Sequence, residues 1–152
     1  MNPYRISISL RVRHPSKSAI EICTRLDLQP KHSWTVGCPR YMTSGEVITA
    51  SASDTYCCFK IPGLITGHME ELEPQGGGLN GKLWTAIQGL KEKREFLREI
   101  ADTGGANEFF VGCFLDKNSG EILDWQVLSY LADFRITLAL DMYPYIPNTE
   151  NW

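Results

Sequence analysis

Strict alternation of apolar and polar residues near both ends of the chain is the feature that most constrains the fold. In residues 4–13, apolar side chains occupy every second position, and arginines and serines stand between them. Residues 136–142 show the same alternation. Successive side chains of a strand point to opposite faces of its sheet, so each segment predicts a strand with one buried face and one wet face. Strands with one buried and one wet face are expected in a sheet that helices cover on a single side.

Three helices are predicted between these strands. Ser18 and Glu21 fit a capping box, which predicts a short helix that ends before Pro30. Apolar residues at helical spacing predict one long helix over residues 82–101, and Asp124 can cap a last short helix. The residues expected to face inward on that last helix are Val127, Leu128 and Leu131.

The remaining segments are assigned from turn residues and β-propensity. Residues 46–51 and 55–61 are strand candidates whose short separation is compatible with a hairpin, and residues 108–115 predict a further strand. Residues 31–45 show no clear period and are interpreted as an irregular loop or an extended edge. Residues 62–81 form a long polar, glycine-rich connection.

The order of these elements predicts the fold class. Strand, helix, strand, strand, helix and strand, followed by helix and strand, indicate an α+β protein with a ferredoxin-like βαββαβ core and a C-terminal αβ extension. The sheet is expected to be mainly antiparallel, with helices on one face. At 152 residues the chain suits one domain, which we place at residues 3–146, with a C-terminal tail at 147–152.

Charge and cysteine usage exclude several classes of function. With 15 basic and 18 acidic residues the net charge is -3, so we expect no nucleic-acid partner. No apolar run approaches the roughly 20 residues that span a bilayer, so we expect a soluble cytoplasmic protein and no membrane partner. Five cysteines without a C-x-x-C pair indicate reduced thiols. The adjacent pair Cys57 and Cys58 is interpreted as one core cysteine beside one surface cysteine, because neighbouring side chains of a strand point to opposite faces.

No catalytic residue, metal site or cofactor is predicted. His14, His32 and His68 lack the spacing of zinc ligands, and no G-x-S-x-G elbow is present. Residues 76–82, GGGLNGK, match G-x-x-x-x-G-K, but Leu83 stands where a phosphate-binding loop needs Ser or Thr. Two interpretations stay open there: a flexible connection, or a helix start that holds a small anion through Gly78, Gly81 and Lys82.

The wet faces of the two terminal strands supply the candidate binding residues. These are Arg5, Arg11 and Arg13 on the first strand, Arg135, Asp141 and Tyr143 on the last, and Trp34 in a cation-rich loop. Arg, Tyr and Trp are enriched at binding surfaces. An ordinary solvated sheet face with cross-strand ion pairs would explain the same strand residues.

Several segments together resemble the bacterial family catalogued as domain of unknown function 4279. They are the step Leu26-Asp-Leu-Gln-Pro30, a loop centred on Gly37, the long amphipathic helix, and the closing unit over residues 128–143. The similarity spans residues 4–145, although Tyr56-Cys-Cys-Phe59 stands where that family is expected to have a tryptophan-containing strand. The resemblance implies a stand-alone bacterial α+β domain and transfers no catalytic residues.

The sequence does not identify a function, and three hypotheses follow from it. The leading one is a non-enzymatic binding or protein-interaction domain with another protein as partner. Neutralising a toxin, as an immunity protein does, would suit a small acidic protein of this kind. The second is a small-molecule or phosphate-binding enzyme that uses residues 76–82. The third is a structural module that self-associates through a large interface.

Overall fold

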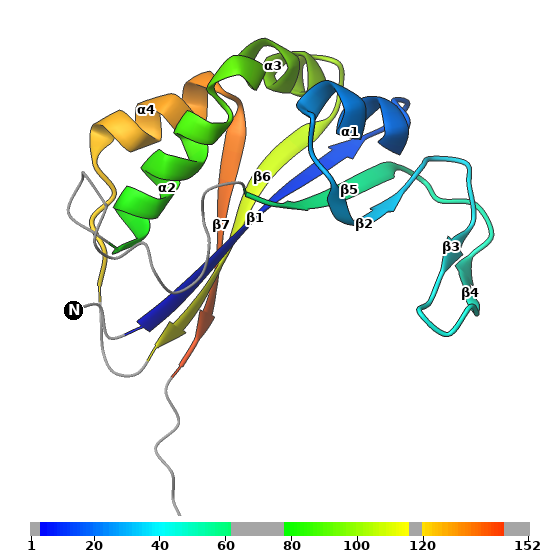
Figure 1. The fold of residues 1–152 in the computed structure, drawn as a ribbon, viewed down its shortest axis with the longest axis horizontal. Helices are drawn as coiled ribbons and strands as arrows, with labels where there is room; N and C mark the ends of the chain where they lie inside the picture. The colour runs from blue at the N-terminus through cyan, green and yellow to red at the C-terminus, as the bar shows by residue number, and fades with distance from the viewer. Residues whose placement is uncertain (1–3, 62–77, 116–119, 145–152) are drawn as a thin grey trace, which may run out of the picture.

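A five-stranded sheet with helices gathered on one side forms the body of the molecule (Figure 1). The structure is a computed structural model that describes residues 4–61, 78–115 and 120–144. The predicted mixed α+β class and the mostly antiparallel sheet are confirmed. The predicted connection over residues 62–81 lies outside the described residues as far as residue 77, and the predicted tail at 147–152 lies wholly outside them.

The strand order is β2-β5-β1-β6-β7. Neighbouring strands pair antiparallel, except β6 and β7, which run parallel. The strands are β1 (Tyr4–His14), β2 (Pro30–Trp34), β5 (Thr55–Lys60), β6 (Ala106–Leu115) and β7 (Ile136–Tyr143). The long β1 is therefore central. Its side chains lie beside those of β5 and β6 on both faces of the sheet.

Two of the predicted helix caps are present. The helices are α1 (Ala19–Leu26), α2 (Gly78–Gly89), α3 (Arg94–Asp102) and α4 (Trp125–Asp133). Ser18 Oγ accepts a hydrogen bond from the Glu21 amide at 3.1 Å, and Asp124 Oδ1 accepts one from the Val127 amide at 2.9 Å. Each cap satisfies a backbone donor that the first helical turn leaves without a partner.

The prediction of one continuous helix over residues 82–101 is wrong. The helix begins earlier, at Gly78, and ends at Gly89, after which the short 3-10 helix η1 (Lys91–Lys93) leads into α3. Glycine is a poor helix former, and the Leu90 amide already bonds the Ile87 carbonyl at 3-10 spacing, 3.0 Å away. The interruption lets α2 and α3 follow the curve of the sheet as separate segments (Figure 1).

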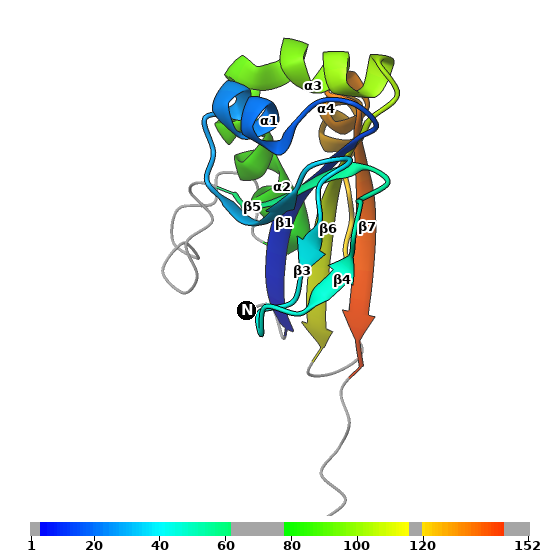
Figure 2. The same ribbon diagram turned by 90° about the vertical axis from the view of Figure 1, so that its right-hand side faces the viewer.

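The predicted hairpin between residues 46–51 and 55–61 is also wrong. β5 pairs instead with β1 and β2, whereas β4 (Val47–Thr49) pairs with β3 (Arg40–Tyr41) in a separate two-stranded ribbon. Figures 1 and 2 show this ribbon projecting from the β2–β5 end of the molecule, apart from the helices. The ribbon exposes four apolar side chains, those of Tyr41, Met42, Val47 and Ile48.

The core lies between the helices and one face of the sheet. Leu10, Phe59 and Phe109 are fully buried there, as the alternation of the strands predicts. Three residues expected to face inward are exposed instead: Leu128 at 47%, Leu140 at 49% and Met142 at 50%. β7 is an edge strand, and its second half extends past the helices, so its inner face receives less cover there (Figure 1).

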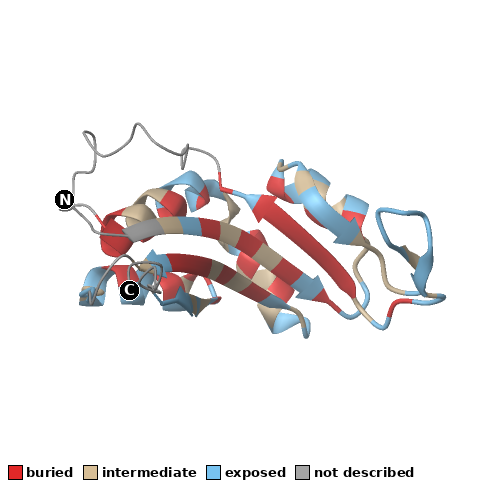
Figure 3. Ribbon diagram, turned by 90° about the horizontal axis from the view of Figure 1, so that it is seen from below, coloured by how far each residue is buried: buried red, intermediate tan, exposed pale blue. Residues whose placement is uncertain are grey.

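The five cysteines are all free thiols. Cys57 is fully buried, and the interpretation of one cysteine of this pair as a surface residue is wrong, because only 6% of Cys58 is exposed. β5 is buried along nearly its whole length (Figure 3). No helix in the described part of the chain is both long and apolar enough to pass through a bilayer.

Candidate functional site

Arginine and aromatic side chains form a continuous row on the face of the sheet that the helices leave uncovered. We call this face the helix-free face and the group the arginine–aromatic row. The row consists of Arg11, Arg13, Trp34, Arg40, Tyr56 and Phe110. β1, β2, β5 and β6 each contribute to it, and the ribbon contributes Arg40. Alternation along the strands places these side chains opposite the core.

Four of these side chains lie one against the next. Cζ of Arg40 lies 3.6 Å from the centroid of the Trp34 ring. The rings of Trp34 and Tyr56 are cross-strand partners and stack, with centroids 4.4 Å apart and planes 25° apart. Cζ of Arg13 lies 4.6 Å from the Tyr56 centroid. Cation–π contacts and offset stacking hold such a series in one arrangement.

Arg11 continues the row toward β6. Its Cζ lies 3.6 Å from the centroid of the Phe110 ring, a diagonal contact between adjacent strands. Glu108 stands directly opposite Arg11 in the strand pairing, yet the described residues include no ion pair between them. The guanidinium of Arg11 is therefore held by packing on a ring rather than by a carboxylate.

Hydrogen-bond donors in the row lack acceptors. In the described part of the chain, four buried side-chain polar atoms have no hydrogen-bond partner, and three are N–H groups of the row: Arg11 Nε, Trp34 Nε1 and Arg40 Nε. Leaving a buried donor unsatisfied costs about 1–3 kcal/mol. Such groups need an explanation in a native structure, and a missing ligand is one.

Arg13 differs from the other two arginines because it has a carboxylate partner. Its Nη1 lies 3.1 Å from Asp54 Oδ2. Among the described residues, no aspartate or glutamate pairs with Arg11 or Arg40. The row therefore contains one guanidinium with an anion and two without one.

The row contains no group suited to general acid–base catalysis at neutral pH. Burial, above all, raises the pKa of the Tyr56 phenol, with a further contribution from Cys58, so Tyr56 remains a neutral hydroxyl. No cluster of three His, Cys, Asp or Glu residues that could hold a metal ion occurs in the described ranges. The arrangement can bind anionic groups, but it offers no nucleophile or base.

The structure brings three of the seven predicted binding residues together: Arg11, Arg13 and Trp34. Asp141 and Tyr143 lie on the same face but two strands away, on β7, where Tyr143 stacks on Phe114 with centroids 4.7 Å apart.

The other two predicted binding residues also lie outside the row, as Asp141 and Tyr143 do. Arg135 has φ of 56° at the start of β7, and its Nε lies 3.8 Å from Asp102, at the end of α3. The backbone of Arg5 pairs opposite Phe114, and its side chain is outside what the structure describes.

Sequence reasoning missed three members of the row. Tyr56 and Phe110 stand at the wet positions of their strands, and an aromatic residue at such a position is the signal that could have found them. Arg40 belongs to the cation-rich loop that contains Trp34, but the sequence does not show which cation of that loop meets the ring, because the contact depends on how the ribbon leaves the sheet.

The helix start proposed as an anion site already has carboxylates beside it. The Leu79 amide donates to Glu121 Oε1 at 3.2 Å, and the Asn80 side chain donates to Asp124 Oδ2 at 2.8 Å. Gly78 and Gly81 are buried in α2, and Lys82 is partly buried on the same helix. A phosphate at this position would face two negative side chains, which is unfavourable.

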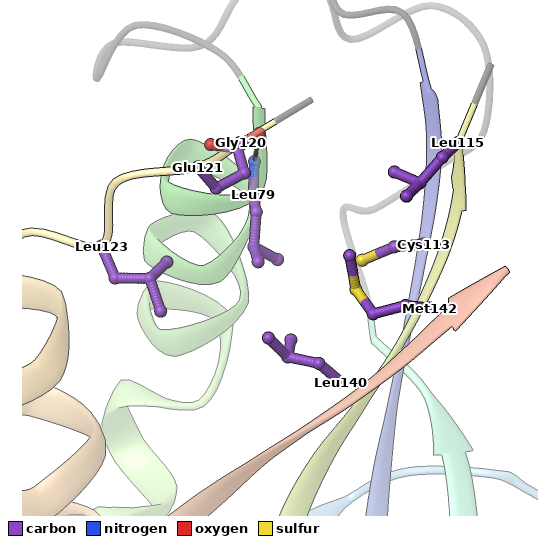
Figure 4. Close-up of a pocket in the computed structure, with 8 residues that line it drawn as sticks. All are labelled: Leu79, Cys113, Leu115, Gly120, Glu121, Leu123, Leu140 and Met142. Atoms are coloured by element: carbon purple, nitrogen blue, oxygen red, sulfur yellow. Dashed lines mark hydrogen bonds between the residues drawn. The ribbon is translucent and has the colours of Figure 1, made fainter. Parts of the chain in front are cut away.

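A small apolar pocket lies between the start of α2 and the far ends of β6 and β7 (Figure 4). Its volume is about 190 Å³. Its lining consists of Leu79, Cys113, Leu115, Gly120, Glu121, Leu123, Leu140 and Met142. Burial raises the pKa of the Cys113 thiol, which keeps it protonated and unreactive. The pocket has one carboxylate, already bonded to α2, and brings no catalytic set together.

Comparison of the chain with protein-family models, with curated proteins and with solved structures finds no match.

Proposed function

We propose that this chain is a non-enzymatic protein-interaction domain that binds its partner on the helix-free face, at the arginine–aromatic row. The observation that carries the proposal is the concentration of unsatisfied buried polar atoms in one row of stacked side chains: three of the four in the described residues belong to the row, and all three are N–H donors. Arg, Trp and Tyr are the residue types that contribute most to protein–protein binding energy. Stacking holds these side chains before a partner arrives, which lowers the entropy cost of binding.

The ribbon supports a protein as the partner. Tyr41 is 60% exposed and Val47 is 58% exposed, and the ribbon joins the row through Arg40. Exposed apolar side chains beside a polar, cationic surface are typical of an interface. A partner that contacts both the row and the ribbon would bury these side chains.

A tagged full-length chain, used as bait in lysate of the source cell, tests the proposal together with Arg11→Gln and Arg135→Gln variants. A protein captured by the unchanged chain is then purified and its affinity for each variant is measured by calorimetry. We expect Arg11→Gln to weaken binding at least about tenfold, since charged hydrogen bonds at interfaces contribute 1.4 kcal/mol or more. Arg135→Gln removes the same charge outside the row and should leave binding unchanged. Equal affinity of the unchanged chain and Arg11→Gln would overturn the site.

Self-association is a second candidate function, favoured by β7. This strand stands at the edge of the sheet and exposes Leu140, Met142 and Tyr143. Edge strands with exposed apolar side chains pair readily with another chain. Light scattering of the purified protein distinguishes the candidates: a dimer that Leu140→Lys dissociates favours self-association, and a monomer counts against it.

The ferredoxin-like core also belongs among the proposals. We infer that β1, α1, β2, β5, the α2–α3 segment and β6 form the βαββαβ unit, with α4 and β7 as the extension. Its support is that β1 lies between β5 and β6, with β2 outside β5, and that all these neighbours are antiparallel. The resemblance to domain of unknown function 4279 and the cytoplasmic location stay predictions.

A further inference from the structure

The aromatic rings of the row are already covered by their neighbours. Trp34 is contacted by Tyr56 and Arg40, and Tyr56 is contacted by Trp34 and Arg13. The Phe110 ring carries Arg11 at 3.6 Å. Proteins that bind single-stranded nucleic acid on a sheet stack the bases on open ring faces. Each ring of this row already has an arginine or another ring against it, and the net charge of -3 gives no general attraction for a phosphate chain.

The guanidinium edges are what the row still offers. A guanidinium packed face-on against a ring keeps its N–H donors in its own plane, directed sideways from the ring. That fork fits the two oxygens of a carboxylate. Arg11 and Arg40 are partly exposed as whole residues, so both can reach a partner.

Arg13 shows that a guanidinium of this row can hold a ring and a carboxylate together. It packs on Tyr56 at 4.6 Å and lies 3.1 Å from the Asp54 carboxylate. Arg11 and Arg40 each pack on an aromatic ring, but neither pairs with a carboxylate within the described residues. The chain thus contains its own example of the contact that the other two arginines leave unmade.

We propose that Arg11 and Arg40 bind carboxylate groups of an acidic segment on a partner protein. This inference rests on the proposed function, because that function assigns the face to protein binding, and it adds the chemistry of the partner. Aspartate or glutamate side chains supply acceptors to the two guanidiniums that have none, in the manner of Asp54 on Arg13. The partner is expected to be acidic at the contact although this chain is itself acidic overall.

A fluorescein-labelled oligoglutamate peptide is the probe, and fluorescence anisotropy with the full chain at low salt is the measurement. The test variant is the Arg11→Lys, Arg40→Lys double substitution, which keeps every charge but removes the planar fork. Arg135→Lys is the matched control outside the row. We expect the double variant to bind at least about tenfold more weakly, which corresponds to about 1.4 kcal/mol, and the control to bind as the unchanged chain does.

Three results would overturn the inference. They are no binding of oligoglutamate to the unchanged chain, equal binding by the double Lys variant, and an Arg11-dependent preference for an oligothymidylate of equal charge. If circular dichroism shows the double variant unfolded, Arg40→Lys alone decides, because Arg40 lies on the ribbon outside the main sheet. If a captured partner needs Arg11 but oligoglutamate does not bind, the proposed protein-binding function stands and only the assignment of carboxylates as the partner groups is overturned. A captured partner indifferent to Arg11 would remove the proposed function itself.

Discussion

On the helix-covered face of the sheet, Leu10 and Phe109 are fully buried beneath apolar side chains. Their neighbours in sequence, Arg11 and Phe110, point to the helix-free face, lie against each other and stay partly exposed. The first face is filled by helices that the chain supplies, so its side chains need only be apolar and fit. The second face has no such layer, and it covers itself with stacked arginine and aromatic side chains. The side chains of the helix-free face are thus held in place by one another and still remain partly accessible to solvent.

β5 shows how far this self-cover extends. Cys57, on the covered face, is fully buried, and Cys58, on the helix-free face, is also buried. Tyr56, beside them, is held between Trp34 and Arg13. A strand buried on both faces is usual in a sheet with helices on both sides. Here the row takes the place of the second helical layer over β5.

The largest expected difference between the faces is between two adjacent phenylalanines. Phe109→Ala should lower the free energy of unfolding by about 3–5 kcal/mol, since it leaves a cavity in a closed core. Phe110→Ala should cost about 1–2 kcal/mol, from a partly exposed ring and one cation–π contact. Urea unfolding of both variants measures the difference. Equal losses would mean that the two faces are packed alike.

The adjacent cysteines test the same contrast with a smaller change. Burial is the main cause that raises the pKa of the Cys57 thiol to about 12, so this side chain behaves as an apolar group. Cys57→Ser should cost about 1–3 kcal/mol, because it places a hydroxyl in an apolar site. Cys58→Ser should cost less than about 1 kcal/mol, because the Tyr56 hydroxyl is a hydrogen-bonding neighbour. Thermal unfolding of the two variants should give clearly different midpoints, with Cys57→Ser the lower.

Titration distinguishes the faces as well, through His14 at the end of β1. This side chain is 2% exposed; its Nδ1 accepts from the amides of Ser16 at 3.0 Å and Lys17 at 2.9 Å. Its Nε2 lies 2.8 Å from Thr103 Oγ1. Burial first, and then the Lys17 charge, lower the pKa of His14, although Glu21 and Glu99 act in the opposite direction.

The sign of the pH effect follows from that lowered pKa. The unfolded chain binds the His14 proton more readily, so stability is fully present above a pH of about 6.5 and falls as the pH drops below it. His14→Asn keeps an acceptor near Nδ1 and should flatten the dependence of the unfolding free energy on pH below about 6.5. His32→Asn, an exposed control on β2, should retain the dependence.

The smallest expected effect on stability belongs to the row. Arg11→Gln loses a cation–π contact worth about 0.5–1 kcal/mol but also removes a buried donor that has no acceptor. These changes oppose each other, so the unfolding midpoint in urea should shift little. A loss above about 2 kcal/mol would show that Arg11 serves mainly to hold the fold, and would weaken the case for a binding role.

Much of the covered face could be predicted from the sequence. Period-two alternation located β1, β6 and the start of β7, and cap chemistry located α1 and α4 through Ser18 and Asp124. The sequence of β2 predicts only an irregular or extended edge, because three polar residues follow Pro30 and the strand pairs through its backbone with β5 alone. Pairing of β5 with β1 rather than β4 is a tertiary choice that local turn residues do not determine.

The row was predictable only in part. The alternation of the first strand predicts that Arg11 and Arg13 lie on its wet face. Trp34 is a candidate binding residue because of its residue type. Register, however, decides which side chains meet across strands: the pairing of Trp34 with Tyr56 follows from the β2–β5 alignment. Arg135 was assigned to the same face by extrapolating the β7 alternation by one residue. Its positive φ breaks that alternation and turns the side chain toward Asp102.

The most direct measurement of the central claim is a nuclear magnetic resonance titration of the full chain with oligoglutamate, following side-chain N–H signals. We expect the Nε–H signals of Arg11 and Arg40 and the indole N–H signal of Trp34 to move together and saturate, because these are the donors without acceptors. The Nε atom of Arg135 lies 3.8 Å from Asp102 Oδ1, outside the row, so the Arg135 Nε–H signal should not shift. If the signals of Arg11, Arg40 and Trp34 stay fixed, or if the shifted signals belong to the start of α2, the row does not bind carboxylates.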